Sequence, residues 1–297
     1  MTGARAGRSG GVVLAGGRST RMGSAKAALE WHGSTLLRRT VGIVGRAVDG
    51  PVVVVRAAGQ PLPELPATTI VVDDPRTGKG PVQGIAAGLA ALRGLAEAAF
   101  VTSTDLPFLH PAFVRRVLGE FGGPGGPEVA LPVARGYQQP LAAGYRTDLA
   151  ERAERLVRED RLRPAFLFDQ CVVTRLDETT LRTDPGLAAA DPELDSLHNV
   201  NTPTEYESAR ARPAPVVTVM LTVDIGPSGD DWLGGRRGQD ASPRRVRAAT
   251  LGQATREAGL PADRWMSATL NGAATERDTA VPLVAGDTVS FLMKSGN

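Results

Sequence analysis

Cysteine is almost absent from this chain, and aromatic residues are scarce. Cys171 is the single cysteine among 297 residues, which excludes an intramolecular disulfide and a thiolate metal cluster. It stands in Phe168-Asp-Gln-Cys-Val-Val-Thr174, where we expect a buried strand residue rather than a nucleophile. Aromatic residues make up 4% of the chain, which argues against a stacking platform for single-stranded nucleic acid.

Neither sign of charge is in excess, and long apolar runs are missing. The formal net charge is +2, so nothing supports a broad nucleic-acid footprint. Arg5 and Arg8 precede the first apolar residues, but no apolar stretch typical of a secretory signal accompanies them. No apolar run is long enough to span a membrane. We therefore expect a protein of the reducing cytoplasm that binds neither nucleic acid nor a membrane.

A glycine-rich, cationic segment directly follows the first apolar run. Residues 14–26 read LAGGRSTRMGSAK, a pattern that predicts a strand ending in a turn. Consecutive N–H groups in such a turn hold phosphate oxygens. The segment carries Arg18, Arg21 and Lys26 and contains neither Asp nor Glu. We expect a nucleoside triphosphate here, although the spacing does not match a P-loop.

Strands and helices alternate along the first 210 residues. The predicted strands cover residues 12–14, 51–55, 69–72, 99–102, 128–132 and 141–145. The predicted helices cover residues 34–48, capped by Ser34, then 81–98 and 111–121. Repeated βα units favour an α/β fold with a mostly parallel, doubly wound sheet and ligands at the carboxyl ends of its strands.

The composition changes near residue 210. Residues 211–215 are rich in proline and alanine, and we interpret them as a linker between a domain at residues 1–210 and a smaller one at 216–297. In the smaller domain we predict strands at 216–225, 267–270 and 288–293, and a helix at 250–258. Asn271-Gly272 is a strong hairpin-turn signal. This order predicts a small α+β domain.

Acidic residues follow two of the predicted strands. Asp105 comes directly after residues 99–102, and a carboxylate at a strand end suits Mg²⁺. The alternative is a turn or helix-capping role. Asp73 and Asp74 end an earlier strand, before a glycine-rich segment that opens the next helix. Unpaired N–H groups at that helix start could meet a phosphate, and a simple turn is the equal alternative.

Two asparagines precede a helix near the end of the first domain. Thr202 can cap the helix that begins at residue 203, with Glu205 in its first turn. Asn199 and Asn201 could hold a substrate or a metal-bound water, and the capping role of Thr202 does not exclude this.

Nucleotidyl transfer fits these residues. A phosphate nucleophile is already ionised, so catalysis would depend on positioning and charge neutralisation rather than on a strong base. Arg21 and Lys26 would neutralise triphosphate oxygens, and Mg²⁺ on Asp105 would assist the departure of pyrophosphate. We therefore assign catalytic roles to these three residues.

The pattern L-A-G-G-x-S-x-R-M-G-x-x-K at residues 14–26 resembles the nucleotide loop of the molybdenum cofactor guanylyltransferases. Further blocks match in order and spacing, at residues 73–84, 104–108, 139–146 and 199–203. The resemblance implies a MobA-like NTP transferase with a Rossmann-like, GT-A-like sheet. It also implies transfer of GMP from GTP to molybdopterin cofactor with release of pyrophosphate.

The resemblance assigns site residues one by one. The nucleotide contacts implied are Leu14, Ala15, Gly16, Gly17, Lys26, Asp74, Gly80 and Asp105, with Asp105 also the Mg²⁺ position. The substrate positions implied are Gln139, Pro140, Asn199 and Asn201.

A few departures from the family pattern bear on base selectivity and rate more than on the fold. Ala25 stands where many relatives have Asp, and Arg56 stands where some have Asn. The Gly16-Gly17 pair favours GTP, because CTP-using relatives often have Ala-Ala-Gly. A CTP-using enzyme, an enzyme with another acceptor and a non-catalytic nucleotide-binding adaptor are the alternatives.

The C-terminal residues resemble a second family, the MoaD/ThiS-like β-grasp proteins. The outline matches at residues 251–260, 270–272 and 285–289. The resemblance implies a ubiquitin-like α+β domain fused to the transferase, with molybdopterin-synthase or molybdoenzyme proteins as partners. Sulfur carriers of this family end in Gly-Gly, whereas this chain ends Lys294-Ser-Gly-Asn297.

We expect that this tail does not work as a sulfur carrier, because its terminus lacks the slim Gly-Gly end that enters an adenylating site. Intact-mass spectrometry after incubation with ATP and an adenylating enzyme of this class should show an unmodified chain. An acyl-adenylate or a thiocarboxylate at Asn297 would contradict the expectation.

Overall fold

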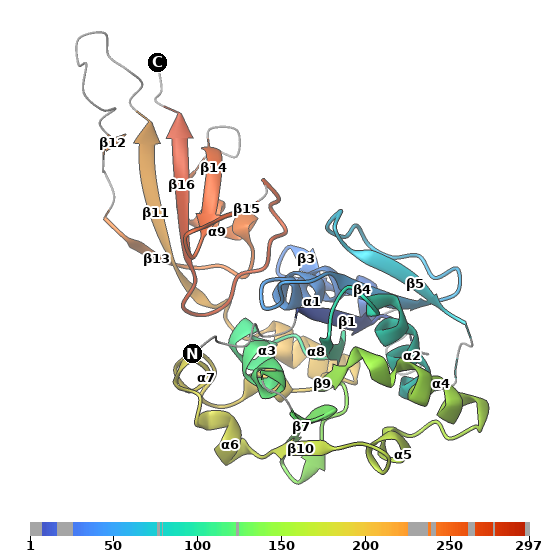
Figure 1. Cartoon of the computed structure of the whole chain (residues 1–297). Helices are drawn as coiled ribbons and strands as arrows, with labels where there is room; N and C mark the ends of the chain where they lie inside the picture. Colours follow the sequence, from blue (N-terminus) through green and yellow to red (C-terminus); the bar gives the residue numbers. More distant parts are fainter. Residues whose placement is uncertain are drawn as a thin grey trace. The chain divides into compact units, whose positions relative to one another are not determined.

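The computed structural model describes residues 8–16, 26–75, 78, 80–122, 125–224, 237–238, 242–260, 265–275 and 277–294 (Figure 1). The chain divides into two compact units. The first comprises residues 1–29 and 35–209, and the second comprises residues 30–34 and 210–297.

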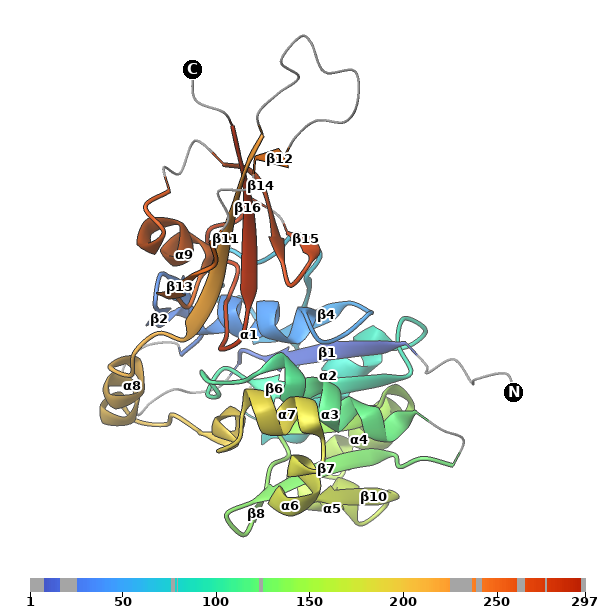
Figure 2. The same cartoon turned by 90° about the vertical axis from the view of Figure 1, so that its left-hand side faces the viewer.

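An eight-stranded sheet forms the centre of the first unit, with the order β10-β7-β9-β6-β1-β4-β5 and with β8 paired to β7. Figure 2 labels most of these strands, among them the central β1. Its strands are β1 (Ser9–Leu14), β4 (Val52–Ala57), β5 (Ile70–Asp74), β6 (Ala98–Ser103), β7 (Val129–Ala134), β8 (Tyr137–Gln138), β9 (Ala142–Arg146) and β10 (Val173–Leu176). Strands β5, β4, β1 and β6 are parallel, and β9 runs antiparallel to both of its neighbours. This confirms the predicted α/β class with a mostly parallel sheet.

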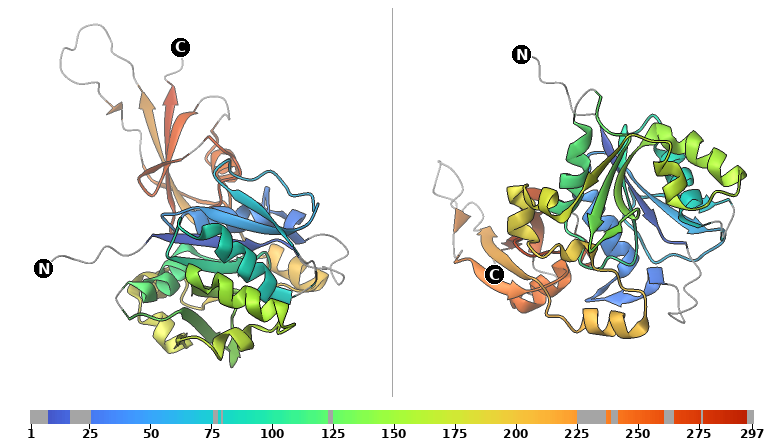
Figure 3. Two further views of the ribbon diagram at one scale, coloured as in Figure 1. Left: turned by 45° about the vertical axis from the view of Figure 1, so that its right-hand side comes forward. Right: turned by 90° about the horizontal axis from the view of Figure 1, so that it is seen from below.

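Helices cover both faces of this sheet (Figure 3). Helices α1 (Leu36–Gly45) and α3 (Pro111–Leu118) pack on one face, and α2 (Gly80–Leu92), α4 (Ala150–Arg158) and α5 (Pro164–Phe168) pack on the other. Helices α6 (Glu178–Arg182), α7 (Pro185–Ala190) and α8 (Pro203–Arg210) complete the described α-helices that begin in this unit, and the short pair β2 (Glu30–Trp31) and β3 (Ser34–Thr35) lies where the chain passes through the second unit. Among the described residues, no helix is long and apolar enough to cross a membrane.

Strand β1 carries the packing of both layers. A Cβ atom on Gly11 would lie 2.3 Å from Cγ1 of Val44 in α1. On the opposite face, a Cβ atom on Gly88 of α2 would lie 2.3 Å from Cγ1 of Val12. Val12 is fully buried, as expected for a strand with a continuous apolar run that is covered on both faces. Glycine at these positions therefore lets the helices approach the sheet closely.

Three local predictions were wrong. Helix α1 is capped by Thr35, whose hydroxyl accepts from the Arg38 N–H at 3.2 Å, rather than by Ser34. Helix α2 ends at Leu92 rather than near residue 98, because Gly94 takes a φ of 77° and turns the chain toward β6. Cys171 lies in a turn before β10 rather than in a strand, and it is half-buried.

A six-stranded mixed sheet and one helix form the second unit. The sheet order is β12-β11-β16-β14-β15, with β13 paired to β11. Its elements are β11 (Val216–Asp224), β12 (Arg237–Gly238), β13 (Arg244–Arg247), α9 (Leu251–Glu257), β14 (Trp265–Leu270), β15 (Ala273–Thr275) and β16 (Thr288–Lys294). Strands β11 and β16 are parallel, and the other pairs are antiparallel.

A helix and a turn of the second unit lie where the sequence predicted them. Helix α9 follows Thr250, whose hydroxyl accepts from the Gln253 N–H. Asn271 and Gly272 both take positive φ, 52° and 84°, in the turn between β14 and β15, as a two-residue hairpin of this type requires. The chain end, including Asn297, lies outside the described residues.

Replacing Gly88 by alanine should destabilise the protein by about 1–3 kcal/mol, because the added methyl group collides with the buried Val12 side chain. The free energy of unfolding, measured by urea denaturation, checks this. Gly119→Ala is the matched control, since a Cβ atom there meets nothing within 4 Å and the φ of −59° is helical. Equal stability of the two variants would contradict the packing argument.

Candidate active site

The chain that leaves β1 stays tied to β4. The N–H groups of Ala15 and Gly16 both donate to the Val55 carbonyl, at 2.8 and 3.2 Å. A Cβ atom on Gly16 would lie 3.0 Å from the backbone nitrogen of Ala57, so glycine permits this close approach. The residues that follow, 17–25, include the predicted Gly17 and Arg21 and lie outside the described residues.

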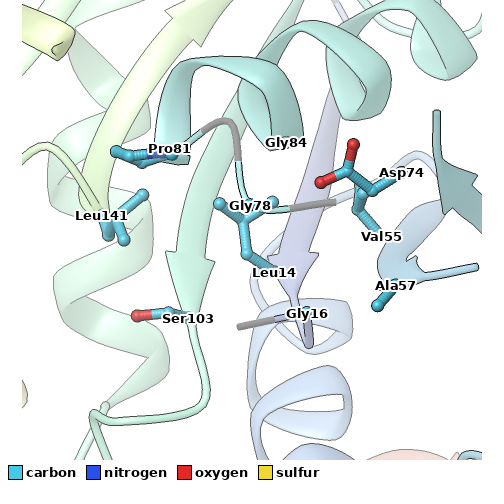
Figure 4. Close-up of a pocket in the computed structure, with 11 residues that line it drawn as sticks. Leu14, Gly16, Val55, Ala57, Asp74, Gly78, Pro81, Gly84, Ser103 and Leu141 are labelled. Atoms are coloured by element: carbon cyan, nitrogen blue, oxygen red, sulfur yellow. The ribbon is translucent and has the colours of Figure 1, made fainter. Parts of the chain in front are cut away.

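A cavity of about 440 Å³ lies at the carboxyl ends of β1, β4, β5 and β6, beside the start of α2 (Figure 4). Its lining residues are Leu14, Gly16, Val55, Ala57, Asp74, Gly78, Gly80, Pro81, Gly84, Ser103 and Leu141. Four of the predicted nucleotide contacts, Leu14, Gly16, Asp74 and Gly80, are among them. We call this space the first cavity.

The two adjacent aspartates at the end of β5 have different surroundings. Arg56 on β4 pairs in register with Asp73, and its Nε donates to Asp73 Oδ1 at 2.7 Å. Asp74 lies opposite Ala57 in the same register, and it lines the first cavity (Figure 4). Because successive side chains in a strand point to opposite faces, only the carboxylate of Asp74 reaches the cavity. The other carboxylate, that of Asp73, pairs with Arg56.

Asp105 lies in the turn that follows β6, and three contacts hold this turn. The Ser103 hydroxyl donates to Asp105 Oδ1. The Asp105 carbonyl accepts from the Val200 N–H at 2.9 Å. Arg39 of α1, only 6% exposed, donates from Nε to the Pro107 carbonyl at 2.8 Å. The carboxylate is thus fixed at a strand end next to a residue, Ser103, that lines the first cavity.

Lys26 reaches the same segment of the chain as the Asp105 turn. Its Nζ donates to the Val200 carbonyl at 2.8 Å and to Asn201 Oδ1 at 3.2 Å. The structure therefore brings together Lys26, Asp105 and Asn201, although they are far apart in sequence.

A second cavity, of about 460 Å³, lies beside this segment. Its lining residues are Ala134, Arg135, Tyr137, Gln138, Gln139, Leu197, His198, Asn199 and Glu205. It contains two of the four predicted substrate residues, Gln139 and Asn199. Of the other two, Asn201 accepts a hydrogen bond from Lys26, and Pro140 is not among the residues of this lining.

Pro140 and Ala15 occupy structural positions. The Pro140 carbonyl accepts from the hydroxyl of Tyr145 at 2.8 Å, and Pro140 is not among the described residues that line either cavity. Tyr145 is fully buried, and this burial raises the pKa of its hydroxyl well above the usual range. Ala15 is also absent from the cavity linings, and its carbonyl accepts from Gln60 Nε2 at 3.1 Å.

Glu205 combines a capping role with a place in the second cavity. Its Oε2 accepts from the N–H groups of Asn201 and Thr202 at 2.6 and 3.0 Å, and the Thr202 hydroxyl accepts from the Glu205 N–H at 3.2 Å. This is the predicted cap at the start of α8. The Asn201 N–H is the main reason that the pKa of Glu205 is lowered, so the carboxylate is charged at neutral pH.

Sequence reasoning missed several residues that shape the site. Gln60 joins the ends of β1 and β4, because its Oε1 also accepts from the Ala57 N–H at 3.1 Å. Arg39 is buried among the apolar residues of α1, and an arginine within such an apolar pattern is a signal that the sequence offered. Tyr137 and Glu205 line the second cavity, which only the folded chain forms.

Comparison with known proteins places the first unit in a family. A family model described as a MobA-like NTP transferase domain matches residues 11–173, which is more than half of the chain. A probable molybdenum cofactor guanylyltransferase of Mycobacterium avium is 42% identical over 150 residues, covering 50% of this chain and 74% of that protein. A protein of the same description from Mycobacterium tuberculosis is 40% identical over 169 residues, covering 56% and 82%.

Solved structures agree on the fold. Molybdopterin-guanine dinucleotide biosynthesis protein A from Archaeoglobus fulgidus matches with a TM-score of 0.53 at 23% identity, covering 68% of this chain and 96% of that one. A homologue of the M. tuberculosis protein Rv0371c, from Mycobacterium sp. strain JC1, matches with a TM-score of 0.50 at 19% identity, covering 69% and 96%. With the match of the family model and the identity to the mycobacterial proteins, the chain belongs to the MobA-like NTP transferase domain family and is a nucleotidyltransferase.

Proposed function

We propose that this enzyme transfers GMP from GTP to molybdopterin cofactor and releases pyrophosphate, and so acts in molybdenum cofactor biosynthesis. The observation that carries the proposal is the meeting of Lys26, Asp105 and the 199–201 segment. The group adjoins both cavities, because Ser103 lines the first and Asn199 lines the second. We propose that the first cavity takes the nucleotide and the second takes the acceptor. The mycobacterial relatives described as probable molybdenum cofactor guanylyltransferases support the choice of substrates.

The first cavity is the proposed nucleoside site. Glycines at its wall leave backbone accessible to a ligand, and the start of α2 supplies the positive end of a helix dipole. Asp74 presents a carboxylate to the cavity. Guanine carries adjacent N–H donors at N1 and at its 2-amino group, which a carboxylate accepts, whereas cytosine offers a single amino group on that side. We therefore propose that Asp74 favours GTP.

Lys26 is the proposed partner of the triphosphate. Its ammonium group donates to two neutral oxygen atoms in the structure. A phosphate oxygen is anionic and adds direct Coulomb attraction to the ammonium group, so phosphate oxygens would compete well for this group. We include Arg21 in the same role, on the sequence pattern alone.

In the proposed step, a phosphate oxygen of the acceptor attacks the α-phosphorus of GTP. A new P–O bond forms as the bond from the α-phosphorus to the bridging oxygen breaks, and pyrophosphate leaves with that electron pair. Lys26 neutralises charge that moves onto the leaving group. The acceptor phosphate is already ionised, so the step needs no protein base.

Asp105 is the residue that we propose holds a divalent cation, Mg²⁺. Its carboxylate and the neighbouring Ser103 hydroxyl are oxygen donors of the kind that Mg²⁺ prefers. Within the described residues no group of three His, Cys, Asp or Glu side chains could hold a metal by itself. This fits an ion that takes most of its ligands from substrate phosphates and water. When bound, the ion supplies neutralising charge to the triphosphate.

We further propose that the second unit is a β-grasp domain, separated from the transferase by residues 211–215. Its antiparallel pair β11–β13, followed by α9 and by a last strand parallel to the first, supports this topology. On this proposal, molybdopterin-synthase or molybdoenzyme proteins would be its partners.

Pyrophosphate release should occur with GTP and not with CTP or ATP when the enzyme is incubated with Mg²⁺ and molybdopterin cofactor. The reason is the match between guanine and the Asp74 carboxylate. Release with CTP would keep the mechanism and change the product. Folded protein that binds a nucleotide but releases no pyrophosphate would contradict the proposed acceptor.

Asp105→Asn should lower kcat at least about 100-fold, because it removes the charge that holds the cation beside the triphosphate. Asp73→Asn is the matched control: this neighbouring carboxylate pairs with Arg56 and is not among the described residues that line the first cavity, so we expect its activity to stay within about twofold. Circular dichroism should show that both variants fold. Full activity of the Asp105 variant would contradict the proposed mechanism.

A further inference from the structure

The second cavity has an exposed aromatic ring at its wall. Tyr137 is 74% exposed, the largest exposure among the large hydrophobic side chains of the described residues. Leaving an aromatic ring in water forfeits the stabilisation that burial would give. The ring stands in the lining of a polar cavity, together with Arg135, Gln139 and Asn199.

The hairpin that carries Tyr137 is braced on several sides. Arg135 and Gly136 both take positive φ, 52° and 78°, in the two-residue turn between β7 and β8. Glu178 Oε1 accepts from the Arg135 N–H at 3.0 Å. Gln139 donates from Nε2 to the Tyr137 carbonyl at 3.2 Å. These contacts fix the backbone of the hairpin, so a ligand that stacks on the ring has to order one side chain and not the whole turn.

Glu205 supplies a carboxylate to the same cavity. Both of its capping bonds, from the N–H groups of Asn201 and Thr202, go to Oε2. The other oxygen, Oε1, takes part in neither bond. A carboxylate accepts about four hydrogen bonds in all, so Glu205 retains the capacity to accept donors from a ligand.

A flat ring surface beside a carboxylate and amide side chains selects one class of ligand. A fused heterocycle with a 2-amino-4-oxopyrimidine edge has a face that stacks on tyrosine. It also has two adjacent N–H donors, and the two lone pairs of Glu205 Oε1 can accept both of them. Pterins are such heterocycles, and a cavity of about 460 Å³ is within the usual size of a small-molecule site.

We infer that the second cavity binds the pterin ring of the acceptor, with the ring stacked on Tyr137 and its 2-amino-4-oxopyrimidine edge at Glu205. This rests on the proposed function for the identity of the acceptor. It adds two residues that the sequence did not assign to substrate binding. Asn199 lines this cavity, and Asn201, two residues along, contacts Lys26. The segment thus links the pterin ring to the site of phosphate chemistry.

Binding of the fluorescent probe pterin-6-carboxylate to the full chain tests the inference directly, because it requires no turnover. Tyr137→Ala should weaken binding about tenfold, the scale of a stacking contact removed by alanine substitution. Tyr137→Phe keeps the ring and should stay within about twofold of the unchanged chain. Glu205→Gln should weaken binding at least about fivefold through loss of the charged acceptor, with thermal unfolding to confirm that α8 is intact.

Leu95→Ala is the matched surface control, since Leu95 is also exposed, at 43%, and lines neither of the two cavities among the described residues. It should bind the probe normally. In steady-state assays, Tyr137→Ala should raise the KM for molybdopterin cofactor and leave the KM for GTP unchanged.

Guanine carries the same edge as a pterin, so a second arm of the experiment separates the two. Excess GTP should fail to displace the probe, and Asp74→Asn should leave probe binding unchanged. Displacement by GTP, or normal probe binding by both Tyr137→Ala and Glu205→Gln, would overturn the inference. Pyrophosphate release is scored separately: Tyr137-dependent probe binding without release would instead count against the proposed function.

Discussion

The hydrogen bond from the Val200 N–H to the Asp105 carbonyl holds the site together. It joins the last segment of the transferase unit to the turn after β6. The carbonyl of the same Val200 accepts from Lys26, so the backbone of one residue contacts the turn that carries Asp105 and also contacts a cation. Positioning of this kind is the main contribution that a protein can make when the nucleophile is already ionised.

The sheet sets the conditions for this arrangement. Glycines in β1 and α2 let helices pack closely on both faces. The carboxyl ends of four strands meet at one edge because these strands are parallel. The first cavity opens there. Buried Arg39 of α1 donates a hydrogen bond to the Pro107 carbonyl, in the chain just after Asp105. A side chain of the packed helical layer therefore holds the turn that carries Asp105.

Features of the site that depend on local sequence could be predicted. Apolar runs located the strands, and a Thr-x-x-Glu pattern located the start of α8. Leu14, Gly16, Asp74 and Gly80, which the resemblance implied as nucleotide contacts, line one cavity. The sequence predicted only that parallel strands end at a common edge, where a ligand can bind.

Features that depend on register or on distant contacts could not be predicted. Which of Asp73 and Asp74 reaches the cavity is decided by the pairing of β5 with β4. The hydrogen bond from Lys26 to Asn201 joins two residues that are 175 positions apart in the sequence. Pro140 was expected to contact the substrate. In the structure its carbonyl accepts a hydrogen bond from buried Tyr145, and the sequence around Pro140 gives no sign of that bond.

The carbonyl groups at the wall of the first cavity bear on how a base is chosen there. The Val55 oxygen has two lone pairs, and the N–H groups of Ala15 and Gly16 use both. The Ala15 oxygen accepts from Gln60. These main-chain acceptors are committed to holding the wall in place. The group left to discriminate between bases at this wall is therefore the carboxylate of Asp74. It attracts a base edge that carries N–H donors and repels an edge that carries carbonyl oxygens. The base is thus selected by its charge pattern as well as by its shape.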